Sequence, residues 1–175
     1  MSVIFLAGVH GVGKGFLGAA VSSTVGITHF TASQLICEEK RLATWGVDKK
    51  TYNLDDNQLS LMRALGQRRL NHKNILLDGH FVLRDAQGVL NPLETTVFKA
   101  MNLTGVILLA EGASVIASRL ALRDKVIPDL QGISELAEAE LAHAQIVCKE
   151  LGLPLAEIHT PTLASLEVAV RIWLE

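Results

Sequence analysis

The sequence predicts a single α/β domain in which a five-stranded parallel sheet lies between two layers of helices. Three observations support this prediction. Short, almost uninterrupted apolar runs recur along the chain, as expected for strands that helices cover on both faces. Longer segments with helical spacing separate these runs, which is the order of βαβ units. The 175 residues contain no repeat or low-complexity linker, so we expect one domain over residues 1–175.

The apolar runs give the expected strands. Four runs are clear and a fifth is weaker; in chain order they span residues 3–8, 27–32 (the weaker one), 74–78, 104–110 and 154–160. Parallel strands need long crossover connections, so the intervening segments are expected to form helices. Ligands bind such sheets at the loops that follow the carboxyl ends of the strands. The irregular stretches at 45–57, 84–93 and 124–133 are therefore of functional interest.

The sequence predicts three of these helices in more detail. The third helix is expected over residues 134–151, with Ser134 as its N-cap and Gly152 beyond its end. For the other two, the spacing predicts which side chains share one face. These faces comprise Leu59, Met62, Gly66 and Leu70 in one helix, and Val115, Ser118, Ala121 and Leu122 in the other.

Composition narrows the class of protein. The net charge is −2, and a general nucleic-acid binder normally has a basic excess, so a nucleic-acid partner is disfavoured. Cys37 and Cys148 lie far apart and are expected to be two reduced thiols. The apolar start at residues 3–6 is too short for a signal sequence, and no run approaches a membrane span. We expect a soluble cytoplasmic protein without a membrane partner, and a homo-oligomer is compatible with the sequence.

The stretch GVHGVGKGF at residues 8–16 follows the first strand and leads into a helical segment. This is the context of a phosphate-binding P-loop, in which inward-facing backbone N–H groups and a lysine hold the phosphates of ATP. The expected nucleotide-binding residues are Gly8, His10, Gly11, Val12, Gly13, Lys14, Gly15 and Phe16. A dinucleotide fingerprint also fits residues 13–18, but the second strand ends without the acid that would hold a ribose.

Gly15 stands where Ser or Thr usually contacts Mg²⁺, and Phe16 also lacks a hydroxyl. Mg²⁺ would therefore depend on other oxygen ligands and on water. Asp78 ends a buried strand, so it is the expected metal carboxylate, acting through water, or it orients the acceptor. Its alternative role is a local cap. His80, two residues further on, is an equally open case between an acceptor contact and a backbone partner.

Three arginines are further candidates. Arg119 and Arg123 are four residues apart on one helical face, and two guanidinium groups suit a polyphosphate. A solvated pair on the helix surface is the alternative. Arg84 follows Asp78 by six residues and is expected near the carboxyl edge of the sheet, where it could hold a second phosphate. With Lys14 and Asp78, Arg119 and Arg123 form the expected catalytic set.

These motifs resemble the adenylate kinase family, especially its archaeal-type branch and the nuclear adenylate kinase-like ATPases. The GKG of the loop is shared, LLDGH resembles LLDGFPR and DTH, and RLALRD resembles the R-L-x-x-R that begins the lid. The segment from Arg84 through Gly88 resembles the one over the nucleoside monophosphate, and GISELAEAELAH resembles the archaeal branch. The resemblance covers most of the chain.

The resemblance implies a P-loop fold with strand order 2-3-1-4-5, a helical acceptor-binding region at 34–73 and a short lid at 124–133. It places Thr31, Ser33, His80 and Arg84 near the acceptor. The implied activity is transfer of the γ-phosphoryl group of ATP to a nucleoside monophosphate, with Mg²⁺. Two alternatives remain: a regulatory ATP-binding protein with weak ATPase activity, and a kinase for a 5′-hydroxyl nucleic-acid end or a small metabolite.

Overall fold

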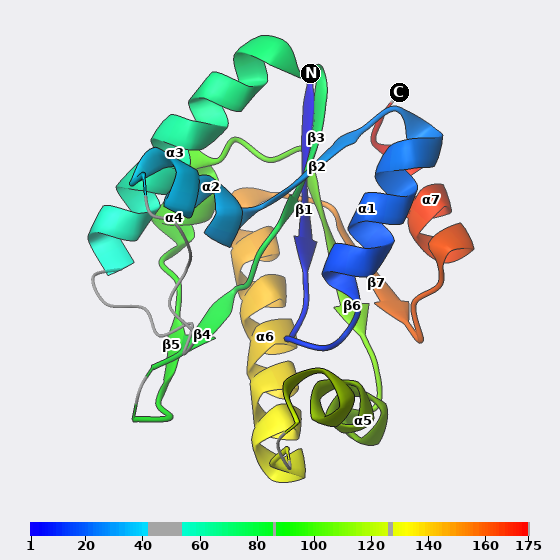
Figure 1. The fold of residues 1–175 in the computed structure, drawn as a ribbon. Helices are drawn as coiled ribbons and strands as arrows, with labels where there is room; N and C mark the ends of the chain where they lie inside the picture. The colour runs from blue at the N-terminus through cyan, green and yellow to red at the C-terminus, as the bar shows by residue number, and fades with distance from the viewer. Residues whose placement is uncertain (42–53, 86, 126–127, 175) are drawn as a thin grey trace.

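The computed structural model describes residues 1–41, 54–85, 87–125 and 128–174 (Figure 1). Its strands are β1 (Ser2–Ala7), β2 (Thr28–Thr31), β3 (Asn74–Asp78), β4 (Val82–Arg84), β5 (Leu90–Pro92), β6 (Gly105–Ala110) and β7 (Leu155–His159). Its helices are α1 (Lys14–Val25), α2 (Ala32–Glu39), α3 (Leu54–Asn71), α4 (Thr95–Ala100), α5 (Ala113–Asp124), α6 (Leu130–Leu151) and α7 (Leu163–Ile172). All five expected strands are present.

The main sheet has the order β2-β3-β1-β6-β7, and every neighbouring pair is parallel. Counted alone, these five strands follow the expected order 2-3-1-4-5. The difference is a separate antiparallel hairpin of β4 and β5, inserted between β3 and β6. The turn of this hairpin and β5 lie in the stretch 84–93 that was expected to be irregular, whereas β4 begins before it at Val82. The α/β fold with a parallel sheet and flanking helices is therefore confirmed.

Side chains of the central strands divide between two cores. In β1, Val3 and Phe5 face one cluster, whereas Ile4 and Leu6 face the other. Strand side chains alternate between the two faces of a sheet, so a continuous apolar run is needed when both faces are covered. Helices α2, α3, α4 and α6 contribute to the first cluster, and α1, α5 and α7 to the second. Figure 1 shows α1 and α7 together on one side and α3 and α4 on the other.

The two helical faces grouped by spacing include residues that the fold leaves exposed. In α3, Leu70 is 85% exposed and Leu59 is also exposed, while Leu61, Ala64 and Leu65 are buried. In α5, Leu122 is 84% exposed, Val115 is also exposed, and Ile116 and Ala117 are buried instead. Both helices carry apolar residues on more than one face, so packing in the folded chain selects the buried face.

Helix α6 begins four residues before the expected start. Its N-cap is Asp129, whose carboxylate accepts the backbone N–H of Gln131. Ser134 lies inside the helix and donates its hydroxyl to the Leu130 carbonyl. The predicted end is correct, because Gly152 adopts the left-handed C-cap conformation. Residues 130–133 of the expected lid are therefore the first helical turn, and residues 126–127 lie outside the described part of the chain.

The region expected to bind the acceptor, residues 34–73, contains most of α2 and all of α3. Residues 42–53 of that region lie outside the described ranges.

Cys148 is buried and Cys37 is half-buried, and both are free thiols. Burial raises the pKa of the Cys148 thiol to about 11. Within the described ranges, every helix is too short or too polar to cross a lipid bilayer.

Candidate nucleotide and acceptor site

The loop between β1 and α1 follows a path that depends on glycine. Gly8 has a φ of +138°, and a Cβ there would lie 2.6 Å from the carbonyl oxygen of Leu109. Gly11 has a φ of +83°, and its Cβ would lie 2.9 Å from the Leu120 side chain. L-residues rarely adopt such φ values. The loop is thus held closely between the end of β6 and helix α5.

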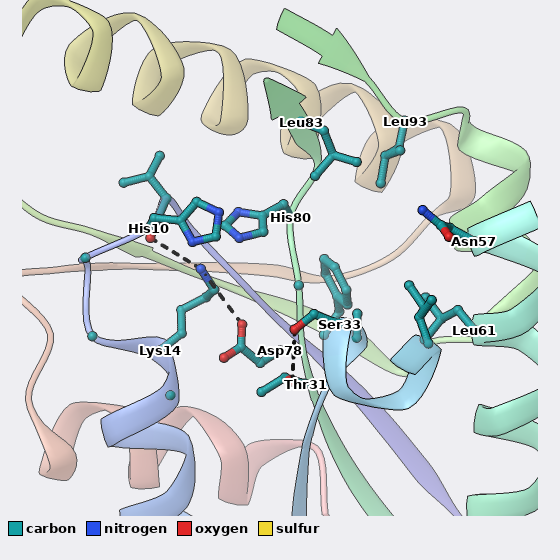
Figure 2. Close-up of a pocket in the computed structure, with 18 of the residues that line it drawn as sticks. His10, Lys14, Thr31, Ser33, Asn57, Leu61, Asp78, His80, Leu83 and Leu93 are labelled. Carbon is teal, nitrogen blue, oxygen red and sulfur yellow. Dashed lines mark hydrogen bonds and ion pairs between the residues drawn. The ribbon is translucent and has the colours of Figure 1, made fainter. Parts of the chain in front are cut away.

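Lys14 is the first residue of α1, and only 6% of its surface is exposed. Its ammonium group donates to the carbonyl oxygens of Gly8 at 2.5 Å and Val9 at 3.3 Å. The same nitrogen lies 3.8 Å from Oδ1 of Asp78 (Figure 2). A lysine ammonium group beside the N-terminus of a helix is an arrangement that binds phosphate.

Asp78 ends β3, and its carboxylate lies between two cationic or ionisable groups. Oδ1 faces Lys14, and Oδ2 lies 3.7 Å from Nε2 of His29 in β2. Among the described residues, Nε2 of His29 has no hydrogen-bond partner although it is buried. The parallel register of β2 and β3 puts Thr31 opposite Asp78 and so brings His29 to this end of the sheet. His29 was not among the predicted site residues.

The absence of a side chain at Gly18 leaves space for the His29 imidazole. A Cβ at Gly18 would lie 2.6 Å from Nε2 of His29. We expect Gly18→Ala to displace the imidazole and to lower the free energy of unfolding by about 1–3 kcal/mol, the usual cost of overpacking. The matched control is Gly66→Ala in α3, where a Cβ meets nothing within 4 Å; it should raise stability by about 0.5–1 kcal/mol. Urea unfolding measures both, and equal effects of the two substitutions would contradict this packing.

Arg119 reaches the phosphate loop from α5. One guanidinium nitrogen donates to the Val12 carbonyl at 3.0 Å, and another lies 3.4 Å from Oε2 of Glu111. Arg123, one turn later, donates twice to the Asp124 carboxylate at 2.7 Å and is half exposed. That pairing raises the pKa of Arg123. Both arginines line the same cavity as Lys14. The predicted grouping of these three cations is therefore present.

A single cavity of about 560 Å³ extends from the loop to the far wall formed by α2, α3 and α4. On the loop side it is lined by His10, Gly11, Gly13, Lys14, Gly15, Phe16, Arg119 and Arg123. On the other side the lining residues include Thr31, Ser33, Ile36, Asn57, Gln58, Leu61, Asp78, His80, Leu83, Leu93, Val97 and Met101. Figure 2 shows Asp78 between Lys14 and the Thr31–Ser33 pair. One cavity is thus lined by residues from both the predicted nucleotide-binding set and the predicted acceptor-binding set.

Several predicted residues lie elsewhere or have a second role. Gly8 and Val12 do not belong to the cavity lining. Thr31 does, but its hydroxyl also caps α2 by accepting the N–H of Gln34 at 3.1 Å. Arg84 lies outside the lining, and its guanidinium donates to the Gly132 carbonyl at 2.9 Å. The structure therefore does not bring Arg84 to the place where a second phosphate was expected.

His80 lines the cavity, and its ring lies 4.3 Å, centroid to centroid, from the ring of His10. Its Nδ1 is 3.8 Å from Oε1 of Glu140. Glu140 is 1% exposed, and burial raises its pKa despite the backbone N–H groups that oppose the shift. Glu140 was not among the predicted site residues, although an acid between Leu136 and Ala144 on one helical face was a usable signal.

Comparison with known proteins identifies the family of this chain. The family model described as an AAA domain (AAA_17) matches residues 7–136. This chain belongs to the AAA_17 family. The AAA_17 match begins one residue before the phosphate loop and ends within α6, so it includes the loop, Asp78, Arg119 and Arg123. No curated protein matches the chain.

Solved structures share the fold of this AAA_17 member. A gluconokinase from Sinorhizobium meliloti 1021 is 16% identical with a TM-score of 0.59, and 99% of this chain and 91% of that chain are covered. A shikimate kinase from Acinetobacter baumannii, in complex with shikimate, is 15% identical with a TM-score of 0.64 and coverages of 99% and 93%. A sugar kinase from Janibacter sp. HTCC2649 is 15% identical with a TM-score of 0.54 and coverages of 99% and 94%. At identities of 15–16%, these likenesses show a shared fold.

Proposed function

We propose that this protein transfers the γ-phosphoryl group of ATP to a hydroxyl or phosphate oxygen of a small acceptor. The observation that carries the proposal is the continuous cavity, which joins the Lys14 end of the phosphate loop to a separate wall beside Asp78. A phosphoryl donor and an acceptor must meet in line within one water-excluding space. A cavity of about 560 Å³ offers room for both reacting ends.

In this reaction the acceptor oxygen forms a bond to the γ-phosphorus while the bond to the β–γ bridging oxygen breaks, and ADP leaves. Lys14, Arg119 and Arg123 neutralise charge as it moves toward the leaving oxygen. The Asp78 carboxylate orients a hydroxyl acceptor and accepts its proton. Loop backbone N–H groups and the start of α1 hold the donor phosphates in place.

Mg²⁺ fits this site only together with the nucleotide. Among the described residues, no group of three or more His, Cys, Asp or Glu side chains is placed to hold a metal. Asp78 lines the cavity, whereas Gly15 offers no hydroxyl. Mg²⁺ usually binds through one or two carboxylates, phosphate oxygens and water. Asp78 would therefore hold the ion through water, and the ion would neutralise charge on the β- and γ-phosphates.

The finer proposal for the acceptor is a nucleoside monophosphate, as the adenylate kinase resemblance implies. The hydroxyls of Thr31 and Ser33 and the helical wall of α2 and α3 support it. A metabolite hydroxyl is the second candidate, because the described acceptor wall is largely apolar and Arg84 is bonded to α6. Both proposals assume a cytoplasmic protein with access to ATP.

The experiment is to incubate the purified protein with Mg²⁺ and γ-labelled ATP, and to add each nucleoside monophosphate or a panel of small alcohols and sugars. Label in a nucleoside diphosphate supports the first acceptor, and label in an alcohol supports the second. Release of inorganic phosphate alone, unchanged by any acceptor, would instead favour the regulatory ATPase. The exposed Phe16 and the hydroxyl-free Gly15 are the features that favour that alternative.

A further inference from the structure

Glu140 is a buried carboxylate in the middle of α6 that accepts three backbone N–H groups from two separate segments. Oε1 accepts Gly8 N–H at 3.2 Å and Phe81 N–H at 3.0 Å. Oε2 accepts Val82 N–H at 2.8 Å and also faces Phe81 N–H at 3.0 Å. Charge-assisted hydrogen bonds of this kind are stronger than neutral ones and fix the groups that they join.

The two segments belong to opposite halves of the cavity. Gly8 begins the phosphate loop, and its carbonyl oxygen accepts a hydrogen bond from the Lys14 ammonium group. Phe81 and Val82 follow directly on Asp78 and His80 and lead into the hairpin whose Leu83 lines the acceptor wall. One carboxylate therefore links the donor loop to the start of the acceptor wall.

A second contact links the same hairpin to α6, because Arg84 donates to the Gly132 carbonyl two helical turns before Glu140. The His10 and His80 rings, one from each half, lie 4.3 Å apart, and Nδ1 of His80 is 3.8 Å from Oε1 of Glu140. Burying a carboxylate is costly unless it is well bonded. An apolar side chain in its place would leave the N–H groups of Gly8, Phe81 and Val82 without this acceptor.

We propose that Glu140 is a positioning residue for phosphoryl transfer, one that sets the spacing between the phosphate loop and the acceptor wall. The inference rests on the proposed function. Removal of the charge should let Gly8 and the segment at 81–82 separate. The donor phosphates would then lie further from the Asp78 carboxylate. A misplacement of reacting groups by about 1 Å costs on the order of 100-fold in rate.

The test compares Glu140→Gln with Val147→Ala. Gln has nearly the same shape but turns an N–H₂ group toward backbone donors. Val147 lies seven residues further along the same helix, is fully buried in the core, and is not a cavity-lining residue. ADP with Mg²⁺ is titrated calorimetrically, and ATP turnover is measured, at a temperature where circular dichroism shows all three proteins folded.

We expect Glu140→Gln to weaken ADP binding by about tenfold and to lower turnover further, while Val147→Ala stays within about twofold of the wild type. Wild-type affinity and turnover in Glu140→Gln would overturn the inference and leave the proposed function intact. An equal loss in Val147→Ala would overturn it as well, because a general loss of stability would then explain both. A wild type that binds no nucleotide would refute the proposed function itself and this inference with it.

Amide hydrogen exchange of the wild type keeps the inference testable even if Glu140→Gln does not fold. ADP should slow exchange at Gly8 and also at Phe81 and Val82, which lie on the acceptor side but share the same carboxylate. Protection confined to Gly8 and its loop would show that Glu140 does not couple the two segments.

Discussion

Substitution of Lys14 by alanine is expected to lower ATP turnover by about 100- to 1,000-fold, the usual loss when one preorganised charge on the reacting group is removed. The ammonium nitrogen lies at the centre of the loop, held by the carbonyls of Gly8 and Val9 and facing Asp78 at 3.8 Å. A phosphate that enters the loop would meet this cation in a buried setting, where its charge is poorly screened. The measurement is initial-rate phosphoryl transfer or ATP hydrolysis over a range of ATP concentrations.

Lys99→Ala provides the matched control for Lys14→Ala. Lys99 is exposed on α4 and lies outside the cavity lining. Its replacement by alanine changes the net charge by the same amount as Lys14→Ala. Its turnover should stay within about twofold of the wild type, as for most surface substitutions. A Lys14→Ala protein that turns over ATP as fast as Lys99→Ala would show that the loop does not hold the reacting phosphates.

Substitution of Asp78 by asparagine should produce the second large effect, a fall in the turnover number by about 100- to 10,000-fold with ATP affinity nearly kept. The amide preserves the shape of the side chain but can neither accept the acceptor proton nor hold a Mg²⁺-bound water as an anion. ATP affinity should not fall, because loss of the carboxylate leaves Lys14 with less competition for phosphate. Steady-state kinetics separates the two parameters.

The matched control for Asp78→Asn is Glu167→Gln, which makes the same carboxylate-to-amide change on α7, outside the cavity lining. Glu167 accepts the Thr24 hydroxyl at 2.5 Å on the surface. A drop in ATP affinity without a drop in turnover in Asp78→Asn would mean that the carboxylate serves binding alone, and the proposed role in the transfer step would have to be abandoned.

Much of the fold could be predicted because its signals are local. The apolar runs mark strands covered on both faces, and the glycines with Lys14 mark a turn whose geometry few other residues permit. The grouping of Lys14 with Asp78 also follows from sequence, since the carboxyl ends of β1 and β3 share one edge of the sheet. Arg119 was placed correctly for the same reason.

The remaining features depend on contacts that no local pattern encodes. The buried faces of α3 and α5 are selected by packing in the folded chain, and the faces grouped by spacing include Leu70 and Leu122, which are exposed. His29 reaches Asp78 only through the register of β2 on β3. Arg84 was assigned from its distance along the chain, but the hairpin of β4 and β5 directs it to α6.

Calorimetric titration of the wild type and Lys14→Ala with ATP and Mg²⁺ shows whether the buried ammonium group and its loop bind a nucleotide. We expect one ATP per chain for the wild type and an affinity at least about tenfold lower for Lys14→Ala, since a charge-assisted contact to phosphate is lost. Absence of binding by the wild type, or equal affinity in the two proteins, would contradict it.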